Sequence, residues 1–302
     1  MKRSTLAVLV VVLLCSPATA SGDGPPVTSL PAGPGGVVEH GGTDRLVALP
    51  AATETIVAMS RVRGGQIRRA LSLAGRWGVP VITEDGGTGG VSADSRTLVL
   101  FRLARAYPRK RSTFSILDLR SFSVARTVSL KGEWSFDALS PDGRWLYLVQ
   151  QLSGRNRASY AVRAYDTERG RLMPEPVVDP REPDEPLQGF PLTRVTGESG
   201  RWEYTLYGGG RGHPFIHALD TVARESICID LPHRIARHRR LFELKLELRG
   251  GQVRVVDRGK LVASASKRAP EKLQAGTGPW VFAAAGLILL LATLGARRRN
   301  RA

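Results

Sequence analysis

Short apolar runs, each bounded by Gly, Pro, Asp or Ser, fill the middle of the chain; residues 97–100 and 145–148 are examples. Runs of this length that are rich in aromatic and β-branched residues predict β-strands. Between residues 41 and 266 no long stretch shows the 3.6-residue period of an amphipathic helix. The pattern therefore predicts an all-β fold.

A tight-turn motif recurs in front of these runs. Asp accepts hydrogen bonds from the backbone of its own turn and Gly tolerates positive φ, so both favour a turn at these positions. A second run follows each motif and ends at Asp118, Asp166 or Asp220. The turn motifs are Ser92-Ala93-Asp94-Ser95-Arg96, Ser140-Pro141-Asp142-Gly143-Arg144 and Glu198-Ser199-Gly200-Arg201.

The two complete copies of this unit, at Asp94 and Asp142, are 48 residues apart. An upstream match places Leu73, Gly75 and Trp77 opposite Leu130, Gly132 and Trp134 at an offset of 57 residues. The extra nine residues fall in the Gly-rich stretch 84–90, which predicts a loop insertion. A fifth, degenerate copy covers residues 244–265, with Gly250-Gly251 as its hairpin turn.

Repeats of this size with four short strands each are typical of propeller blades. Residues 41–266 hold about 4.7 such units, which predicts a β-propeller of about five blades, with four or six left open. The alternative is a β-sandwich, which also uses regularly spaced short strands.

The string Ser140-Pro141-Asp142-Gly143-Arg144-Trp145 resembles the blade signature of TolB-type and other WD-like propeller repeats, and residues 164–167 resemble their later strand. The resemblance implies an exported bacterial propeller. The chain as a whole is also similar to exported, membrane-anchored, actinobacterial-type propeller proteins with no assigned activity. These signatures shape turns, so the resemblance transfers no functional residue.

The N-terminus has the pattern of a secretory signal peptide. Lys2 and Arg3 precede an apolar run over residues 6–15, and a small-x-small site predicts cleavage after Ala20. Residues 1–20 are therefore expected to be removed, and residues 21–40 form a Gly/Pro-rich linker. An uncleaved anchor and a lipidated Cys15 are the alternatives.

The C-terminus has the pattern of a membrane anchor. Residues 279–296 carry no charge, and the basic tail 297–302 follows at once. Eighteen such residues can cross a bilayer, and the arginines hold their end in the cytoplasm. The pattern predicts a juxtamembrane linker over 267–278 and a single-pass protein of the cell membrane with its N-terminus outside. A buried helix and a cell-wall sorting tail are the alternatives.

Composition adds a strong basic charge. The 302 residues include 44 Lys+Arg and 27 Asp+Glu, a formal net charge of +17. For an exported chain, this charge favours an anionic wall polymer, lipid headgroups or an envelope protein as partner, and not nucleic acid. The alternative is genome bias toward arginine. The candidate contact residues for an anionic partner are Arg234, Arg237, Arg239 and Arg240; a solvated loop between blades is the alternative.

The remaining polar residues are interpreted as structural rather than as catalytic or metal-binding. His213 and His217 are four apart, but His217 lies in an expected strand beside Pro214, so the two side chains are expected to diverge rather than hold a metal. Cys228, the one cysteine left after cleavage, is expected to be a core thiol. The basic segment 102–111 and the acidic, Pro-rich segment 179–186 are expected to be solvated loops. We therefore predict no catalytic residue, metal site or cofactor.

The function that these patterns favour is a membrane-tethered, extracytoplasmic binding or scaffold module. An alternative is a cell-envelope hydrolase or lyase with its site at the mouth of the propeller channel, because single acids on separate blades leave no motif. A second alternative is a sensor ectodomain that works through a membrane partner.

Overall fold

The computed structural model describes residues 35–104, 108–152, 159–184, 187–208, 213–236, 240–266 and 274–275. The predicted signal peptide, the spanning segment 279–296 and the basic tail lie outside these residues. Within the described ranges, no helix is long and apolar enough to cross a membrane. The described residues form five antiparallel sheets, which we number 1 to 5 in chain order.

Sheets 1 and 2 contain the first eight strands, each paired antiparallel to its neighbour. The first strand lies inside the predicted linker 21–40, so the folded region begins before residue 41. Sheet 1 consists of β1 (Val37–Val38), β2 (Asp44–Pro50), β3 (Glu54–Arg61) and β4 (Ile67–Ala74). Sheet 2 consists of β5 (Trp77–Gly78), β6 (Thr97–Arg102), β7 (Arg111–Asp118) and β8 (Ser123–Lys131).

Sheet 3 has four consecutive strands and a short fifth strand that pairs with its third. Its consecutive strands are β9 (Trp134–Leu139), β10 (Trp145–Gln151), β11 (Ser159–Asp166) and β12 (Arg171–Val177). The fifth is β13 (Leu187–Gln188), which pairs with the beginning of β11.

Sheets 4 and 5 follow, separated by α1 (His233–Ala236) and a short 3-10 helix (Leu241–Glu243). The last strand lies inside the segment 267–278 that was predicted to be a linker. Sheet 4 consists of β14 (Phe190–Thr196), β15 (Trp202–Gly208), β16 (Phe215–Asp220) and β17 (Glu225–Asp230). Sheet 5 consists of β18 (Lys245–Arg249), β19 (Gln252–Asp257), β20 (Lys260–Ser266) and β21 (Gln274–Ala275).

The recurring turn motifs directly precede the second strand of sheets 2, 3 and 4. In sheet 3, Ser140 Oγ donates to Asp142 Oδ1 (2.5 Å) and accepts a hydrogen bond from the amide of Trp145 (2.9 Å). In the turn before β6, Ser92 makes the same two bonds with Asp94 and Thr97. The prediction of equivalent turns at these two positions is confirmed.

The sequence match between residues 73–77 and 130–134 corresponds to equivalent hydrogen bonds in the structure. At the start of sheet 2, the Thr55 hydroxyl donates to the carbonyl of Gly75 and accepts from the amide of Trp77. At the start of sheet 3, Ser112 bonds Gly132 and Trp134 in the same way. Both glycines have φ above +90°, which favours glycine over other residues.

Neighbouring sheets pack face to face along the chain. Strand side chains alternate between the two faces of a sheet, so a strand between two sheets contributes to two clusters. On β6, Leu98 and Leu100 pack toward sheet 1, while Val99 and Phe101 pack toward sheet 3. A further cluster joins sheets 4 and 5 around Leu206.

The predicted loop insertion, between β5 and β6, contacts sheets far from it in the sequence. The amides of Glu84 and Asp85 donate to the carbonyls of Pro191 and Leu192 in β14. Asp85 also accepts a hydrogen bond from Lys245 at the start of β18, at 2.7 Å. The β5–β6 loop (residues 79–96) therefore links sheet 2 to sheets 4 and 5.

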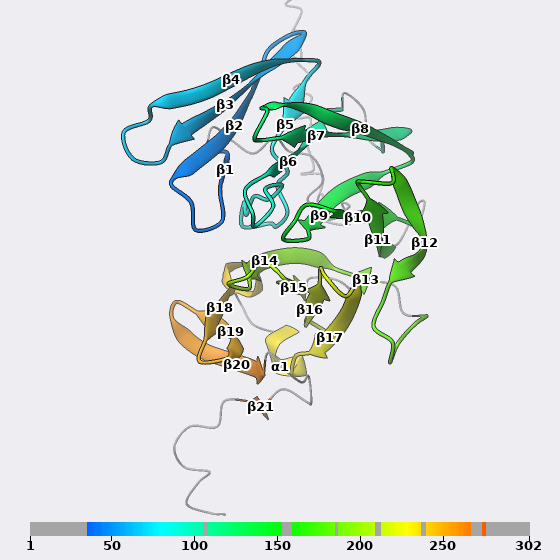
Figure 1. Ribbon diagram of the computed structural model, residues 1–302. Coiled ribbons are helices and arrows are strands. Elements are labelled where there is room, and N and C mark those ends of the chain that lie inside the picture. Colours follow the sequence, from blue (N-terminus) through cyan, green and yellow to red (C-terminus); the bar gives the residue numbers. More distant parts are fainter. Residues whose placement is uncertain are drawn as a thin grey trace, which may run out of the picture.

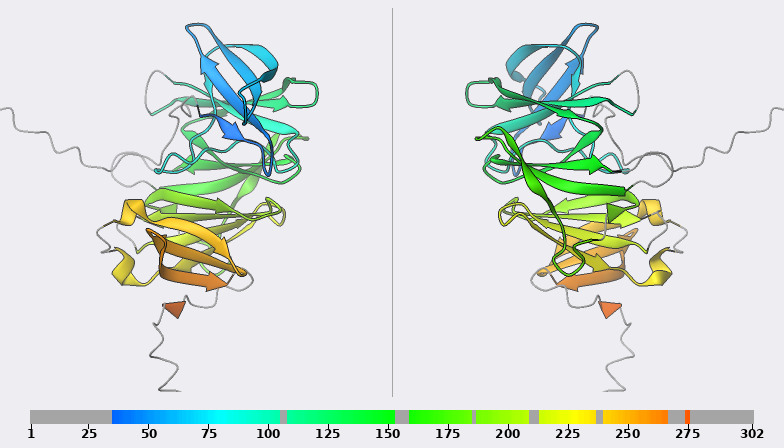
Figure 2. Two further views of the ribbon diagram at one scale, coloured as in Figure 1. Left: turned by 90° about the vertical axis from the view of Figure 1, so that its left-hand side faces the viewer. Right: turned by 90° about the vertical axis from the view of Figure 1, so that its right-hand side faces the viewer.

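Figure 1 shows the sheets following one another in chain order, from β1–β4 at the top through β5–β12 to β14–β20 at the bottom. The side views of Figure 2 show the same succession from blue to orange. Five antiparallel sheets packed in this order make an all-β fold consistent with a propeller of about five blades.

Candidate functional site

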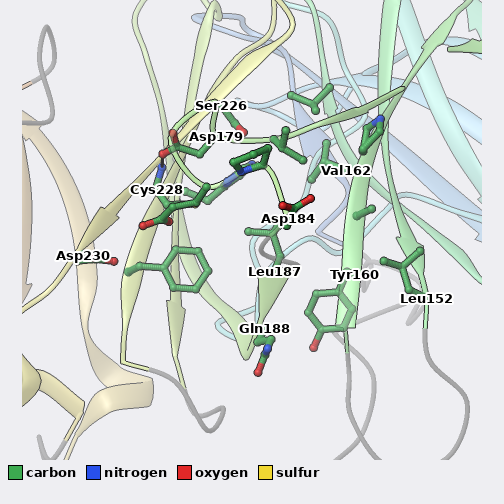
Figure 3. Close-up of a pocket in the computed structure, with 18 of the residues that line it drawn as sticks. Leu152, Tyr160, Val162, Asp179, Asp184, Leu187, Gln188, Ser226, Cys228 and Asp230 are labelled. Atoms are coloured by element: carbon green, nitrogen blue, oxygen red, sulfur yellow. Dashed lines mark hydrogen bonds between the residues drawn. The ribbon is translucent and has the colours of Figure 1, made fainter. Parts of the chain in front are cut away.

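A cavity of about 280 Å³ lies between sheets 3 and 4 (Figure 3). We call it the outer cavity, because it lies among β11, β12, β16 and β17, the third and fourth strands of their sheets. Residues between β12 and β13, among them Asp179 and Asp184, also line it. Its size is near the lower end of the ~300–1,000 Å³ typical of ligand sites. Its lining includes Leu152, Tyr160, Val162, Val177, Asp179, Glu182, Asp184, Leu187, His213, Phe215, His217, Ser226, Cys228 and Asp230.

The cavity exists because apolar packing between these two sheets is sparse. The buried cluster that joins them takes five side chains from sheet 3 and only Leu219 from sheet 4 among the described residues. Polar contacts hold the sheets together elsewhere: Tyr147 Oη donates to the carbonyl of Thr221 (2.8 Å), and Arg194 pairs with Asp137. The third and fourth strands are therefore left apart.

Asp179 and Arg181 fix the beginning of the segment between β12 and β13 against β17. Asp179 accepts hydrogen bonds from the Arg181 guanidinium (2.6 Å) and from the amide of Cys228 (2.7 Å). Arg181 in turn donates to the carbonyl of Cys228 (2.8 Å). The two side chains thus satisfy backbone groups at the outer edge of β17, as a neighbouring strand would.

The same contacts set the charge of Asp179, whose side chain is 2% exposed. Burial alone would raise the pKa of this carboxyl, but the hydrogen bonds from Arg181 and the Cys228 amide outweigh it and lower the pKa. Asp179 is therefore an ionised, paired anchor. The expectation of a solvated loop is wrong at this residue.

His217, at the centre of β16, is 2% exposed. Neither of its ring nitrogens has a hydrogen-bond partner within the described part of the chain. Its ring packs edge to face on Tyr207, with centroids 6.2 Å apart. Burial lowers the pKa of its imidazole to about 4, so the ring is neutral at pH 7. It then offers one N–H donor and one nitrogen acceptor.

Ser226, on β17, is a second buried polar group in the wall, 1% exposed. Its Oγ also lacks a partner among the residues described. Burying a polar atom without a hydrogen bond costs about 1–3 kcal/mol. Both groups thus belong to residues that line the cavity, and both lack a partner in the described part of the chain.

Acids dominate the charged groups around the cavity. Asp179, Glu182, Asp184 and Asp230 line it, and no Lys or Arg stands among the described lining residues. Asp230 lies 2.6 Å from Nε2 of His213 at the rim.

His213 and His217 both line the cavity, but His213 bonds Asp230 while His217 is buried without a partner in the described residues. One expectation about this region was wrong. Cys228 is half-buried in the cavity wall and is not a core thiol. It lies opposite His217 on the neighbouring strand, a pairing that depends on strand register.

The expected basic contact residues do not join this site. Arg234 is exposed in α1, and Arg240 lies 3.7 Å from Asp257 in an ion pair. Arg237 and Arg239 lie outside the described residues. These four residues therefore remain a prediction.

The second basic loop was also expected to be solvated, and this is wrong for Arg109. Its guanidinium is buried between Glu133, which it bonds through Nε (2.7 Å), and the ring of Phe101, 4.3 Å away. Arg109 is therefore a structural link between sheets 2 and 3.

A smaller cavity of about 130 Å³ is lined by residues of sheets 1, 3 and 4 and of the β5–β6 loop. Arg194 on β14 pairs there with Asp137 on β9, and Thr196 donates to Glu203 at 2.8 Å. Burial raises the pKa of Glu203. Within the described chain, no group of three His, Cys, Asp or Glu residues could hold a metal ion.

The solved structures to which this chain is similar include β-propeller proteins, all at low identity. A prolyl endopeptidase shares 12% identity (TM-score 0.43, 78% of this chain, 37% of that one). TolB from Acinetobacter baumannii shares 10% (TM-score 0.34, 78% and 63%). The Swd1 β-propeller domain from Myceliophteria thermophila shares 10% (TM-score 0.44, 80% and 69%).

The chain thus spans well under half of the endopeptidase, and likenesses this distant carry no conclusion about ligand or activity. No model of a known protein family matches the chain. No curated protein matches it either.

Proposed function

We propose that this chain is a binding module of the β-propeller class whose ligand enters the outer cavity. The observation that carries the proposal is the pair of buried, unpartnered polar groups, His217 and Ser226, in the wall of a mostly apolar cavity. Ligand sites combine an apolar lining with a few placed polar groups in this way. A bound molecule would supply the hydrogen bonds that both side chains lack.

The test is a screen of small molecules by saturation-transfer NMR, with the purified full chain in detergent. Ala161→Phe adds a ring to the half-buried lining position Ala161 and is expected to abolish binding. Ala70→Phe makes the same change at an exposed position of β4 and is expected to leave binding intact. Binding that survives Ala161→Phe, or a screen without any hit, would overturn the proposal.

We propose further that the module is extracytoplasmic and held by one membrane span, with the C-terminus in the cytoplasm. The apolar runs at residues 6–15 and 279–296 and the arginines after residue 296 support this topology. A protease added to intact cells is expected to spare a C-terminal tag. Loss of the tag would contradict the topology.

The basic residues Arg234, Arg237, Arg239 and Arg240 are proposed to contact an anionic wall polymer, lipid headgroups or an acidic envelope protein. The net charge of +17 supports this. Affinity purification from native membranes at low and high salt is expected to recover a polyanion that high salt releases. A partner that remains at high salt would indicate a scaffold for that protein instead.

A hydrolase or lyase is the second candidate function. Asp137 and Glu203 line one cavity, and the raised pKa of Glu203 is a property of general acids. Turnover of a cell-wall glycan that Glu203→Gln abolishes would support it. Equal turnover by wild type and variant would exclude Glu203 as the acid.

A further inference from the structure

We infer that two copies of this chain associate through the free face of sheet 1, in a dimer with two-fold symmetry. The free face is the side of sheet 1 that points away from sheet 2. The strand register places these side chains on it: Val38 of β1, Arg45, Val47 and Leu49 of β2, Glu54, Ile56, Ala58 and Ser60 of β3, and Ile67, Ala70, Ser72 and Ala74 of β4. The outer cavity lies elsewhere, between sheets 3 and 4, so the inference does not depend on it.

The free face has no covering layer within the described residues. Buried apolar clusters join sheet 1 to sheet 2, sheet 2 to sheet 3, sheet 3 to sheet 4 and sheet 4 to sheet 5, but none of them joins sheet 5 to sheet 1. Figure 1 shows these two sheets at the two ends of the succession. Large apolar side chains therefore stay exposed on the free face: Leu49 by 50%, Ile56 by 37% and Ile67 by 65%.

The middle of the free face is suited to packing against another sheet. Val47 lies opposite Ala58, and Leu49 lies opposite Ile56, so two apolar rows cross the face without a charge between them. On β4 the neighbouring positions are small, as at Ala70. Small and β-branched side chains let a second sheet approach to about 10 Å, the usual distance between packed sheets.

Sheet 5 of the same chain is a poor cover for this face. Leu246 of β18 packs toward sheet 4, so the alternate residues Lys245, Glu247 and Arg249 point to the other side, and all three are exposed. On the same side, Arg254 lies 3.8 Å from Glu247. Packing this side on sheet 1 would bury several charges beside apolar groups, which is costly. A second copy of the free face brings far fewer charges.

The two charges of the free face lie at its opposite ends. Arg45 is at one end and Glu54 at the other, with Leu49 and Ile56 between them. Six residues of strand separate the two positions, or about 20 Å, so they cannot pair within one chain. Arg45 forms no ion pair with a described residue. Glu54 accepts a hydrogen bond from the hydroxyl of Ser72, which leaves its charge unneutralised.

This distribution of charge makes the free face complementary to itself. A two-fold axis that runs across the strands, parallel to the sheet, turns the second copy end for end. Arg45 of each copy then meets Glu54 of the other, and the apolar rows meet in the middle. An axis along the strands would instead place Arg45 against Arg45, so repulsion between like charges selects the first arrangement.

The size of the face predicts a weak dimer. Four strands about 4.8 Å apart and about 20 Å long cover about 400 Å² in each copy. Stable interfaces bury about 800 Å² in each partner. We therefore expect a dissociation constant of about 100 μM.

Sedimentation velocity of the purified full chain, in a density-matched detergent at up to about 500 μM, tests the inference. Ile56→Thr removes apolar area from the middle of the face and is expected to weaken the dimer about tenfold. Val124→Thr makes a similar change on β8, at a side chain that is 40% exposed and outside the free face. This control is expected to leave the dissociation constant unchanged.

An exchange of charges tests the arrangement of the two copies. Arg45→Glu alone and Glu54→Arg alone each bring like charges together twice in the symmetric dimer, so each is expected to weaken it about tenfold. The double variant restores both opposite pairs and is expected to recover the wild-type dissociation constant to within about twofold. Such recovery requires contact between copies, because the two residues are too far apart to meet within one.

A chain that stays monomeric over this range of concentration would overturn the inference. So would a dimer that Ile56→Thr leaves unchanged, or a double variant that does not recover; association through another part of the chain would have these properties. If Arg45→Glu does not fold, Glu54→Arg and Ile56→Thr still decide the outcome. A monomer whose Tm falls in Ile56→Thr, but not in Val124→Thr, would show that another segment of the same chain covers the face.

Discussion

At the scale of single residues, two buried polar groups in the wall of the outer cavity lower the stability of the fold. His217 and Ser226 bury polar atoms that the described chain leaves without hydrogen bonds. A phenyl ring in place of the imidazole would keep most of the contact with Tyr207 and remove the unpartnered nitrogens. Stability and the proposed binding of a ligand therefore make opposite demands on residue 217.

We expect His217→Phe to stabilise the protein, and to stabilise it more at pH 5 than at pH 7. An unfolded histidine titrates near pH ~6.5, whereas the folded pKa of His217 is about 4. The unfolded wild type binds more protons between these values, so its stability falls as the pH falls through this window. Denaturant unfolding should show the advantage of the variant growing by about 2 kcal/mol from pH 7 to pH 5.

Ser226→Ala is the matched control for this experiment. It also removes a buried unpartnered polar group, but one that does not titrate. Its effect is therefore expected to be the same at both pH values. Parallel pH profiles for wild type and His217→Phe would show that the imidazole is not buried in its neutral form.

Arg109 and Glu133 are a buried pair whose two members come from different loops. Glu133→Ala would leave the guanidinium buried with its main partner removed. We expect a loss of about 3–5 kcal/mol in the free energy of unfolding. The control Glu243→Ala breaks an exposed pair with Arg258 (3.6 Å) and should cost less than about 1 kcal/mol.

At the scale of elements, the turn motifs act through bonds within six residues. Ser140 is 1% exposed and holds both the Asp142 carboxylate and the Trp145 amide. The copy in sheet 4 differs: Ser199 is exposed and accepts one long bond from the amide of Arg201 (3.3 Å). The serine side chain of the motif is therefore expected to contribute more to stability in sheet 3 than in sheet 4.

Ser140→Ala is expected to destabilise the fold by about 1–3 kcal/mol, because the amide of Trp145 is left without its acceptor. Ser199→Ala is expected to cost less than about 0.5 kcal/mol, as exposed substitutions usually do. Thermal unfolding of both variants checks this. Equal losses would mean that the side-chain bonds contribute little to either turn.

At the scale of the whole molecule, the β5–β6 loop links sheets that are distant in sequence. Asp85 accepts bonds from Thr83 (2.6 Å) and from Lys245 of sheet 5 (2.7 Å). Burial would raise the pKa of Asp85, but these bonds outweigh it and lower the pKa. The loop therefore helps to hold sheet 5 in place through the ion pair between Asp85 and Lys245.

Asp85→Ala is expected to speed amide hydrogen exchange in β18 about tenfold, because sheet 5 loses a link to the rest of the fold. Exchange in sheet 1, whose described residues make no hydrogen bond with Asp85, should stay as in wild type. Glu84→Ala, at the exposed neighbouring carboxylate, is the control and should leave β18 unchanged. Unchanged exchange in the Asp85 variant would show that sheet 5 is held by its packing on sheet 4.

The strands, the turns and the repeat could be predicted from the sequence because their causes are local. The bonds of Ser92, Asp94 and Thr97 lie within six residues. The alternation of the β6 side chains between the two faces of sheet 2 follows from the geometry of a strand. The Gly-Trp match at residues 75–77 and 132–134 was found for the same reason. The number of sheets followed from counting these local units.

The candidate site could not be found in this way, because its residues are brought together only by the packing of two sheets. Asp184, His217 and Ser226 come from a loop and two strands, and none belongs to a motif. The burial of Arg109, and of Asp179 against the edge of β17, also depends on distant partners. The sequence by itself determined the strands, the turns and the basic charge, which arise from neighbouring residues. The tertiary structure decided which polar groups are buried and where a cavity remains, because packing between distant segments sets both.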